Sequence, residues 1–172
     1  MSESTDSGLV GRMIAVSQLR GDFVLSSGRR SSVYFDKFRF LSDPILLDEI
    51  ASAVQALLPD GVTHLAAPEG AATLLLAAVG IRSGLPMAVV RKRAKGYGTR
   101  EQVEGYAPEG ARIGLLEDVS TTGHQVAKAA KALEARGAEV ACIVLVLDRG
   151  GAETLRNEGY ETRAVAVLRP DA

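Results

Sequence analysis

The chain has 172 residues, of which 47% are hydrophobic, with a formal net charge of −1 and a single cysteine, Cys142. This length fits one ordinary globular domain, and one cysteine excludes a fold held together by disulfides within the chain. The balanced charge argues against a protein that is held to nucleic acid mainly by neutralising phosphates, because such proteins are usually basic.

Residues 1–8 are polar and acidic, and we expect a short flexible leader without the features of a signal peptide. The longest nearly uncharged apolar stretch, residues 71–81, is shorter than the roughly 20 residues that cross a bilayer. We therefore expect a cytoplasmic protein that binds neither membrane nor nucleic acid, with residues 1–172 forming one domain.

Apolar residues at helical spacing predict a first helix over residues 8–19. Two short β-prone runs, residues 23–25 and 33–35, flank a turn-rich segment. A second helix is expected to begin with Asp43 as its N-cap and Pro44 as its first helical residue.

The rest of the chain alternates between short apolar strands and amphipathic helices. Strands are predicted at residues 62–66, 87–90, 112–116, 140–147 and 162–168. Helices are predicted at residues 71–83, 123–136 and 152–158, and residues 91–105 are predicted to be a charged loop. This alternation is typical of βαβ units around a parallel sheet that is covered by helices on both faces.

Two adjacent carboxylates, Glu117 and Asp118, follow a predicted strand and precede the Ser-Thr-Thr-Gly turn of residues 120–123, which opens a helix. Ligands of α/β proteins bind at the carboxyl ends of strands, and the free N–H groups at the start of a helix attract phosphate. The carboxylates can accept hydrogen bonds from ribose hydroxyls, provided that the strand turns at Asp118, because neighbouring strand residues point to opposite faces. The alternative interpretation is a threonine that only caps the helix, with both acids in a solvated loop.

The loop of residues 91–105 carries Lys and Arg side chains between glycines, which predicts a mobile lid that closes on an anion. The alternative interpretation is a solvated surface segment, which is the usual role of a run of charges. A nucleic-acid patch is disfavoured because only Tyr97 offers an aromatic ring for stacking beside these charges.

Arg149 follows the strand predicted at residues 140–147. Its guanidinium can hold a planar carboxylate by two parallel hydrogen bonds, or it can form an ordinary ion pair with Asp148 or Glu153. The aromatic rings of Tyr34 and Phe35 can likewise pack against the face of a planar ligand, or they can belong to the core.

Residues 115–123 (Leu-Leu-Glu-Asp-Val-Ser-Thr-Thr-Gly) resemble the signature by which type I phosphoribosyltransferases bind 5-phosphoribosyl 1-diphosphate (PRPP). Three further segments resemble the orotate phosphoribosyltransferase family, in the order of that family: residues 23–37, 91–98 and 146–153. The resemblance implies the type I phosphoribosyltransferase fold. This is an α/β fold with a central, mainly parallel sheet flanked by helices, a small N-terminal hood and a mobile catalytic loop.

The resemblance also implies a reaction in which the phosphoribosyl group of PRPP is transferred to orotate, giving orotidine 5-phosphate and diphosphate in pyrimidine synthesis. Mg²⁺ is the expected cofactor, carried by PRPP rather than held by the protein alone. A homodimer is expected because the catalytic loop of this family reaches the active site of the neighbouring subunit. The alternatives are transfer to another base and a non-catalytic PRPP-binding regulatory protein.

The positions that match the family give the expected site residues. The expected catalytic residues are Lys95, Glu117 and Asp118. The residues expected to bind PRPP are Arg91, Lys92, Lys95, Tyr97 (in place of the family's histidine), Glu117, Asp118, Ser120, Thr121, Thr122, Gly123 and His124. The residues expected to bind orotate are Tyr34, Phe35, Thr121 and Arg149. The segment at residues 66–72 lies where the family binds diphosphate.

Overall fold

The computed structural model describes residues 7–24, 28, 30–94 and 101–168. Within these ranges six strands form one sheet in the spatial order β5-β4-β3-β6-β7-β8, and every neighbouring pair is parallel except β4 with β5. The strands are β3 (His64–Pro68), β4 (Met87–Val90), β5 (Val103–Gly105), β6 (Arg112–Ser120), β7 (Glu139–Asp148) and β8 (Thr162–Val167). The mainly parallel sheet predicted from the sequence is confirmed.

The strand order has a switch point between β3 and β6. From β3 the chain proceeds outward to β4 and β5, whereas from β6 it proceeds in the other direction to β7 and β8. The connections that leave β3 and β6 therefore diverge, and the crevice between them, at the carboxyl ends of the strands, is where open α/β sheets bind ligands.

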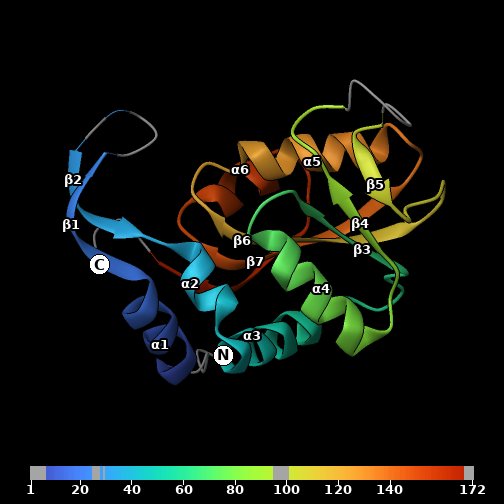
Figure 1. Ribbon diagram of the computed structural model, residues 1–172. Helices are drawn as coiled ribbons and strands as arrows, with labels where there is room; N and C mark the ends of the chain where they lie inside the picture. Colours follow the sequence, from blue (N-terminus) through green and yellow to red (C-terminus); the bar gives the residue numbers. More distant parts are fainter. Residues whose placement is uncertain (1–6, 25–27, 29, 95–100, 169–172) are drawn as a thin grey trace.

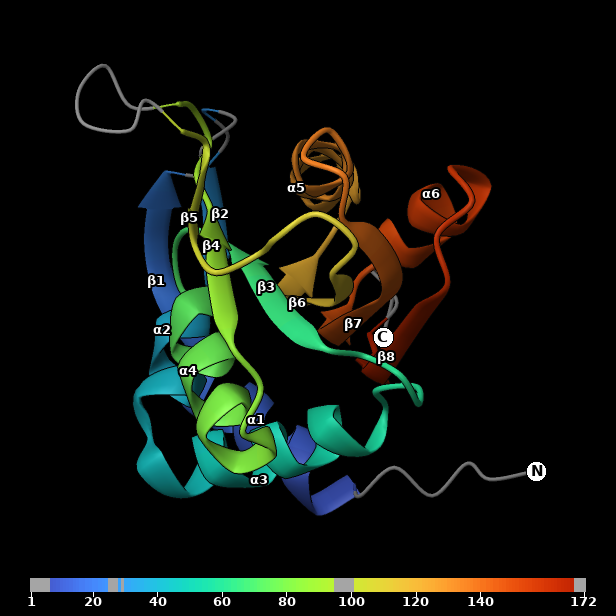
Figure 2. The same ribbon diagram turned by 90° about the vertical axis from the view of Figure 1, so that its right-hand side faces the viewer.

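Helices cover both faces of this sheet, as predicted. Figure 2 shows α3 (Pro44–Ala56) and α4 (Ala72–Ser83) on one face, and α5 (His124–Glu134) and α6 (Gly151–Asn157) on the other. Neighbouring residues of β6 alternate between the two cores: Leu116 packs with α3 and α4, and Leu115 packs with α5 and α6. Burying one such leucine stabilises the fold by about 1.5–3 kcal/mol.

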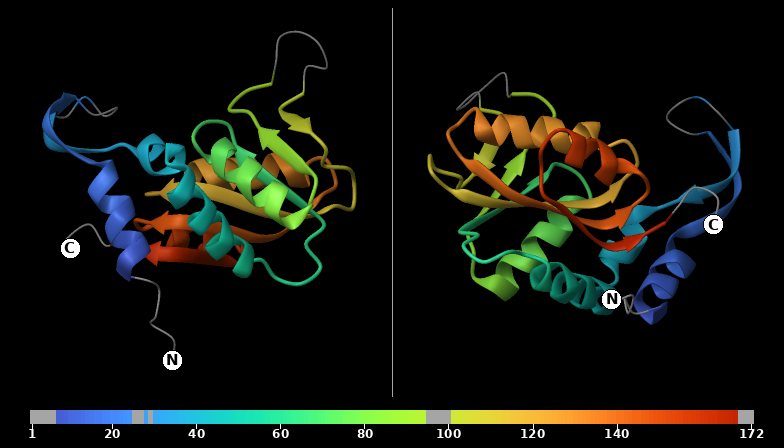
Figure 3. Two further views of the ribbon diagram at one scale, coloured as in Figure 1. Left: turned by 60° about the horizontal axis from the view of Figure 1, so that its bottom comes forward. Right: turned by 180° about the vertical axis from the view of Figure 1, so that it is seen from behind.

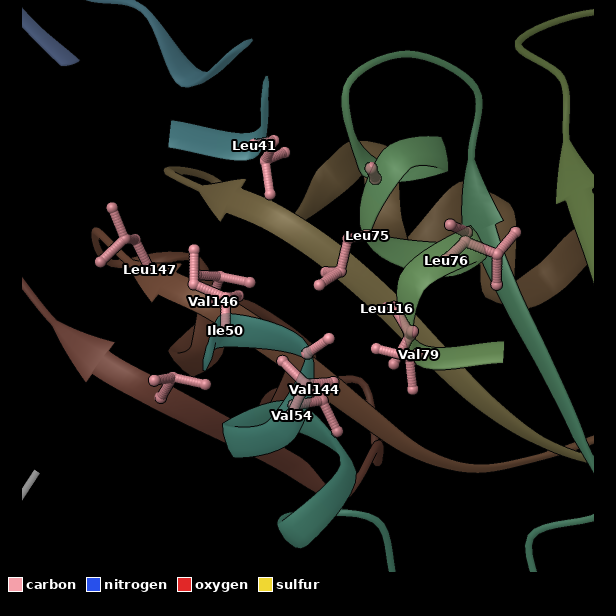
Figure 4. Close-up of a cluster of buried hydrophobic side chains, with 14 of the residues drawn as sticks. Leu41, Ile50, Val54, Leu75, Leu76, Val79, Leu116, Val144, Val146 and Leu147 are labelled. Atoms are coloured by element: carbon pink, nitrogen blue, oxygen red, sulfur yellow. The ribbon is translucent and has the colours of Figure 1, made fainter. Parts of the chain in front are cut away.

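Side chains from α3, α4, β6 and β7 form a large part of the core on the first face. Figure 4 shows α3 and α4 contributing side chains that face those of β6 and β7: Ile50, Val54, Leu75, Val79, Leu116, Val144 and Val146. The α3 helix begins as the sequence predicts, because Asp43 accepts hydrogen bonds from the N–H groups of Ile45 and Leu46, at 2.9 and 3.1 Å. None of the described helices is long and apolar enough to span a membrane.

The N-terminal part forms a hood, which we define as α1 (Ser7–Ser17), the antiparallel strands β1 (Gln18–Val24) and β2 (Arg30–Phe35), and α2 (Lys37–Ser42). Figure 1 shows the β1–β2 ribbon standing apart from the central sheet. In the left view of Figure 3 the arrowheads of the central strands point toward the hood. Met13 and Phe40 are fully buried in the core beside α3, so the helices of the hood anchor it at the carboxyl edge of the sheet.

The boundaries of three elements in or beside the hood and loop differ from the predicted ones. The first helix ends at Ser17, where its carbonyl accepts the N–H of Asp36 at 2.9 Å and the β1–β2 ribbon begins. The short α2 helix was not predicted; Asp36 caps it by accepting the N–H of Phe38, and tertiary packing buries Phe40 and Leu41. The β5 strand lies inside the segment predicted as a loop, because its backbone pairs with the edge of β4.

The β6 strand continues to Ser120, four residues beyond its predicted end at Leu116. Its ladder with β7 persists through the pairs Glu117 with Leu145 and Ser120 with Asp148. The strand therefore does not turn at Asp118, so the condition under which both acids were expected to reach one sugar is not met. The polar residues of this segment do not end the strand because the long β7 strand supplies backbone partners along its whole length.

Candidate active site

A cleft of about 580 Å³ opens at the carboxyl edge of the sheet, at the switch point. Three parts of the chain line it: the hood, the β3–α4 turn, and the turns that follow β6 and β7. The lining residues are Phe35, Lys37, Phe38, Pro68, Glu69, Gly70, Ala71, Ala72, Lys92, Glu117, Asp118, Val119, Ser120, Thr121, Thr122, Gly123, Gln125, Val126 and Arg149. The cleft thus unites most of the predicted site residues within the described part of the chain.

The two adjacent carboxylates both line the cleft, although they leave β6 on opposite faces. Asp118 shares the face of Leu116, which packs toward α3 and α4, whereas Glu117 shares the face of Leu115, which packs toward α5. The cleft reaches both carboxylates because it wraps around the end of the strand. Both side chains are buried, Asp118 completely, so the alternative of two acids in a solvated loop is wrong.

The Asp118 carboxylate has one oxygen with partners and one without. Its Oδ1 atom lies 2.9 Å from the Nζ atom of Lys37 and also accepts the N–H of Val119. Its Oδ2 atom is buried and has no hydrogen-bond partner among the described residues. A buried carboxylate oxygen without a partner is costly, and a ligand hydroxyl that donates a hydrogen bond would satisfy it.

Burial raises the pKa of Glu117 to about 8, and the neighbouring charge of Asp118 adds to this effect. The Oε1 atom of Glu117 accepts the N–H of Asp118 at 3.1 Å. The Lys37 ammonium acts in the opposite direction and lowers the pKa of Glu117. The two acids therefore differ in environment, and Glu117 takes up a proton near neutral pH.

The turn at residues 120–123 presents backbone N–H groups to the cleft. The α5 helix begins at His124, and its N-cap is Gly123 in a left-handed conformation with φ of 75°. No side chain caps this helix, so the alternative in which a threonine serves only as the cap is wrong. The first N–H groups of the helix have no partner within the helix, and they attract an anion such as phosphate.

Two glycines let the turns that follow β6 and β7 pack against each other. A Cβ atom on Gly123 would lie 2.6 Å from the carbonyl oxygen of Gly151, and a Cβ atom on Gly151 would overlap the Oγ atom of Ser120. The Arg149 N–H donates to the Ser120 carbonyl at 2.8 Å, which fixes the two turns side by side. The phosphate-type turn is therefore positioned by the turn that carries Arg149.

The guanidinium carbon of Arg149 lies 6.0 Å from the ring centroid of Phe35. Neither Asp148 nor Glu153 forms an ion pair with Arg149 within the described ranges. Asp148 instead accepts the N–H groups of Gly150 and Ala152, at 2.9 and 3.0 Å. The guanidinium thus lies in the cleft beside an aromatic ring, with its hydrogen-bond donors available to a ligand.

Phe35 and Tyr34, both predicted to contact a base, occupy different environments. Phe35 lines the cleft, whereas Tyr34 is not among the lining residues and packs its ring 5.5 Å from that of Phe23. The two are neighbours on β2, so their side chains point to opposite sides of the ribbon.

The first residues of the predicted catalytic loop are held by Glu69 of the β3–α4 turn. The Oε1 atom of Glu69 accepts the N–H of Lys92 at 2.9 Å, and its Oε2 atom lies 4.0 Å from Arg91, which also pairs with Glu104. Lys92 lines the cleft, and Arg91 does not. Lys95 and Tyr97 lie outside the described residues.

A second cleft, of about 720 Å³, lies between the base of this loop and α5. It is rich in cationic side chains, and Lys92 and Thr122 line it as well as the first cleft. Its basic residues are Arg91, Lys92, Arg93, His124, Lys128 and Lys131. The predicted residues Arg91 and His124 therefore lie beside the first cleft rather than inside it.

Sequence reasoning missed two hood residues that line the cleft, Lys37 and Phe38. Both lie within three residues after Phe35, but nothing in their spacing indicates that they approach β6. Glu69 was noted only as part of a short turn. Its contact with Lys92 joins two turns that the sequence separates.

No family model matches the chain. Among curated proteins it resembles orotate phosphoribosyltransferases, with 43% identity to that of Methanopyrus kandleri over 84% of this chain and 79% of the relative. The protein of the same name from Nocardioides is 41% identical over 93% of this chain and 90% of the relative.

The fold is also similar to solved structures. The Mycobacterium tuberculosis orotate phosphoribosyltransferase in complex with PRPP matches with a TM-score of 0.78 and 28% identity, over 93% of this chain and 94% of that one. A UMP synthase from Leishmania donovani matches with a TM-score of 0.79 and 25% identity over 97% of this chain. The present chain spans 37% of that longer protein.

Proposed function

This chain belongs to the orotate phosphoribosyltransferase family, and we propose that the cleft at the carboxyl edge of its sheet carries out the reaction of that family. The reaction transfers the 5-phosphoribosyl group of PRPP to orotate and yields orotidine 5-phosphate and diphosphate, a step of pyrimidine nucleotide synthesis. The bond from the anomeric carbon to the diphosphate oxygen breaks, and diphosphate leaves with its electron pair. N1 of orotate forms the new bond to that carbon.

The observation that carries this proposal is the presence of an acidic and a cationic site within one cleft. Glu117 and Asp118 lie beside the phosphate-type turn on the β6–α5 connection, and Arg149 lies on the neighbouring turn. A phosphorylated ribose needs acceptors for its hydroxyls next to donors for its phosphate. Orotate carries a carboxylate, for which a guanidinium is the complementary group.

The acid pair and the turn divide the binding of PRPP between them. The unpartnered Oδ2 atom of Asp118 supports a role as acceptor for a ribose hydroxyl, and Glu117 accepts a second one when it is ionised. The N–H groups at residues 121–124 donate to the 5-phosphate, together with the exposed hydroxyls of Thr121 and Thr122. These contacts hold the anomeric carbon in a fixed position for attack, which lowers the entropic part of the barrier.

Orotate is placed on the hood side of the cleft. Arg149 donates two parallel hydrogen bonds to its carboxylate, and the Phe35 ring covers one face of the pyrimidine. This arrangement turns N1 of the base toward the ribose. The Arg149 guanidinium disfavours a purine without a carboxylate, which would leave that charge unpaired.

The negative charge that develops on diphosphate is stabilised by the cations at the base of the loop. Lys92 lines the cleft, and Lys95 and Arg91 are the further loop cations that the family resemblance assigns to this role. One preorganised donor of this kind contributes about 2.7–4 kcal/mol to stabilising a transition state. The Glu69 contact to the Lys92 N–H supports this role, because it fixes the base of the loop at the β3–α4 turn.

Mg²⁺ fits this cleft as a companion of PRPP. In the part of the chain that is described, no cluster of three or more His, Cys, Asp or Glu side chains could hold a metal ion by itself. The orphaned Asp118 Oδ2 atom and the Glu117 carboxylate are hard oxygen donors, which Mg²⁺ accepts beside substrate phosphates. When bound, Mg²⁺ would neutralise part of the charge on the diphosphate.

We further propose a homodimer in which Lys95 acts in the cleft of the partner subunit. Support comes from residues 91–98, which resemble the catalytic loop that this family extends into the active site of the neighbouring subunit. The single cysteine, which is buried, supports a reducing compartment and hence a cytoplasmic location.

The proposal is tested by incubating the purified protein with orotate, PRPP and Mg²⁺ and measuring orotidine 5-phosphate. Formation of this product, with adenine, hypoxanthine and uracil as poor competing bases, is the expected result. Faster turnover of another base would assign the chain to that base. PRPP binding in calorimetry without turnover of any base would instead identify a regulatory protein.

A further inference from the structure

One short segment of the hood contacts both halves of the cleft. At its start, Phe35 lies beside Arg149, the residue assigned to orotate. Two residues later, Lys37 reaches Asp118, the residue assigned to the ribose, over a sequence separation of 81 residues. The segment therefore links the side of the cleft that takes the base to the side that takes the sugar.

The Lys37 contact differs from the ordinary surface ion pairs of this protein. Its Nζ atom lies 2.9 Å from Asp118 Oδ1, and the Asp118 side chain has 0% exposure whereas that of Lys37 is 42% exposed. Exposed pairs contribute little to stability, but a buried carboxylate that loses its partner leaves an uncompensated charge. Lys37 is thus the cation that compensates the buried Asp118 charge.

The pair also leaves the carboxylate in a defined orientation. Lys37 and the Val119 N–H both contact Oδ1, and Oδ2 remains without a partner in the described part of the chain. A carboxylate held through one oxygen presents the other in a fixed direction. Such preorganisation lowers the entropic cost of binding a hydroxyl there.

We propose that Lys37 is a positioning residue for phosphoribosyl transfer: it orients the Asp118 carboxylate toward the ribose and fastens the hood to the floor of the cleft. This inference rests on the proposed function. It adds to that function a residue outside the β6–α5 motif and outside the catalytic loop. Lys37 acts on the substrate through Asp118, so its loss should mainly weaken the affinity for PRPP.

The experiment compares Lys37→Met with Lys37→Arg and with the matched control Arg39→Met. Arg39 lies on the same short helix and its side chain is 56% exposed. Among the described residues it forms an ion pair only with Asp36, at 3.8 Å, and it does not line the cleft. Kinetic constants for PRPP and orotate are measured for each variant, so that an effect on KM is separated from an effect on kcat. Thermal unfolding of each variant reports on folding.

In Lys37→Met we expect the KM for PRPP to rise by about tenfold or more, the size expected from losing one charge-assisted hydrogen bond. Lys37→Arg, which keeps the charge, should recover most of the affinity for PRPP, and Arg39→Met should resemble the parent protein.

Equal behaviour of Lys37→Met and Arg39→Met would overturn the inference, as would a lowered unfolding temperature with an unchanged KM for PRPP. If Lys37→Met does not fold, Lys37→Gln replaces it, and an unchanged KM for PRPP in that variant also overturns the inference. Absence of orotate turnover in the parent protein would instead count against the proposed function. The PRPP affinities of the same variants, measured by calorimetry, still decide the role of Lys37 in that case.

Discussion

The Arg149 guanidinium, on the turn after β7, lies 6.0 Å from the ring of Phe35, at the end of the hood strand β2. A cation over an aromatic face is attracted by the quadrupole of the ring, whose face is electronegative, and this contact favours a guanidinium position in the cleft. Because Asp148 is engaged by two backbone N–H groups, its negative charge is not directed at Arg149. The pair forms a corner with one cationic and one aromatic wall, which suits a flat carboxylate-bearing ring.

Arg149→Gln should therefore weaken orotate binding selectively. We expect the KM for orotate to rise about 10- to 100-fold, because a bidentate charge-assisted contact is lost, while the KM for PRPP changes little. Initial rates with each substrate varied in turn measure the two constants. Arg82→Gln on α4, which removes a pair with Asp48 far from the cleft, is the control. Equal increases in both KM values would contradict the assignment of Arg149 to the base.

The ionisation of Glu117 should appear in the pH dependence of the reaction. Burial, followed by the Asp118 charge, raises the pKa of Glu117 to about 8, so the free protein carries a neutral Glu117 at lower pH. The ionised form is the stronger acceptor for a ribose hydroxyl, because a charge-assisted hydrogen bond is about twice as strong as a neutral one. We expect kcat/KM for PRPP to increase with pH through a pKa near 8, and Glu117→Gln should abolish this limb. If kcat/KM of Glu117→Gln for PRPP increases over the same pH range as that of the parent, the ionisation belongs to another group.

The same group should make stability fall as the pH rises. Between the ordinary glutamate pKa of 4.5 and the folded value of about 8, the folded state keeps a proton that the unfolded state has lost. The free energy of unfolding therefore decreases across this window and levels off above it. Glu117→Gln should remove this decrease and be more stable than the parent at pH 8 by about 1 kcal/mol or more. Urea unfolding at several pH values gives the free energy of unfolding of the parent and of Glu117→Gln as a function of pH. If the two proteins show the same dependence on pH, the prediction is refuted.

Gly151→Ala should damage the phosphate-type turn. A Cβ atom there would overlap Ser120 Oγ and lie 2.9 Å from the Gly123 nitrogen, so the two turns must separate. We expect a loss of stability of about 1–3 kcal/mol from overpacking and a weaker affinity for PRPP. Calorimetric titration with PRPP gives the affinity. Gly11→Ala is a suitable control, since a Cβ atom on Gly11 meets nothing within 4 Å.

The proposed sharing of Lys95 between subunits can be tested by mixing two inactive variants. Lys95→Ala and Asp118→Asn should each be nearly inactive alone. In mixed dimers one cleft combines the intact Asp118 of one chain with the intact Lys95 of the other. Random mixing should therefore restore about a quarter of the parent activity. A chain whose Lys95 serves its own cleft would show no recovery.

Much of the fold and of the candidate site could be predicted from the sequence, because the signals for them lie within short, continuous segments. The β6 strand, the turn at residues 120–123 and the start of α5 form one continuous segment. Its apolar strand, acid pair and glycine-containing turn follow one another along the chain, and together they predict a sugar-phosphate site. The start of α3 was equally predictable, because Asp43 and Pro44 act on the backbone within a few residues. Arg149 was found because it directly follows a strand whose end must lie at the same edge of the sheet.

The sequence alone therefore determined the alternation of elements, the parallel sheet and the residue types at its carboxyl edge. The tertiary structure decided which of those residues meet. Lys37 reaches Asp118, and Glu69 holds the Lys92 N–H, only because the hood and the turns are folded against one another. The raised pKa of Glu117 has the same origin, since burial and an adjacent charge come from packing. Contacts between distant segments depend on how helices pack and which strands become neighbours, and residue spacing along the chain does not record that.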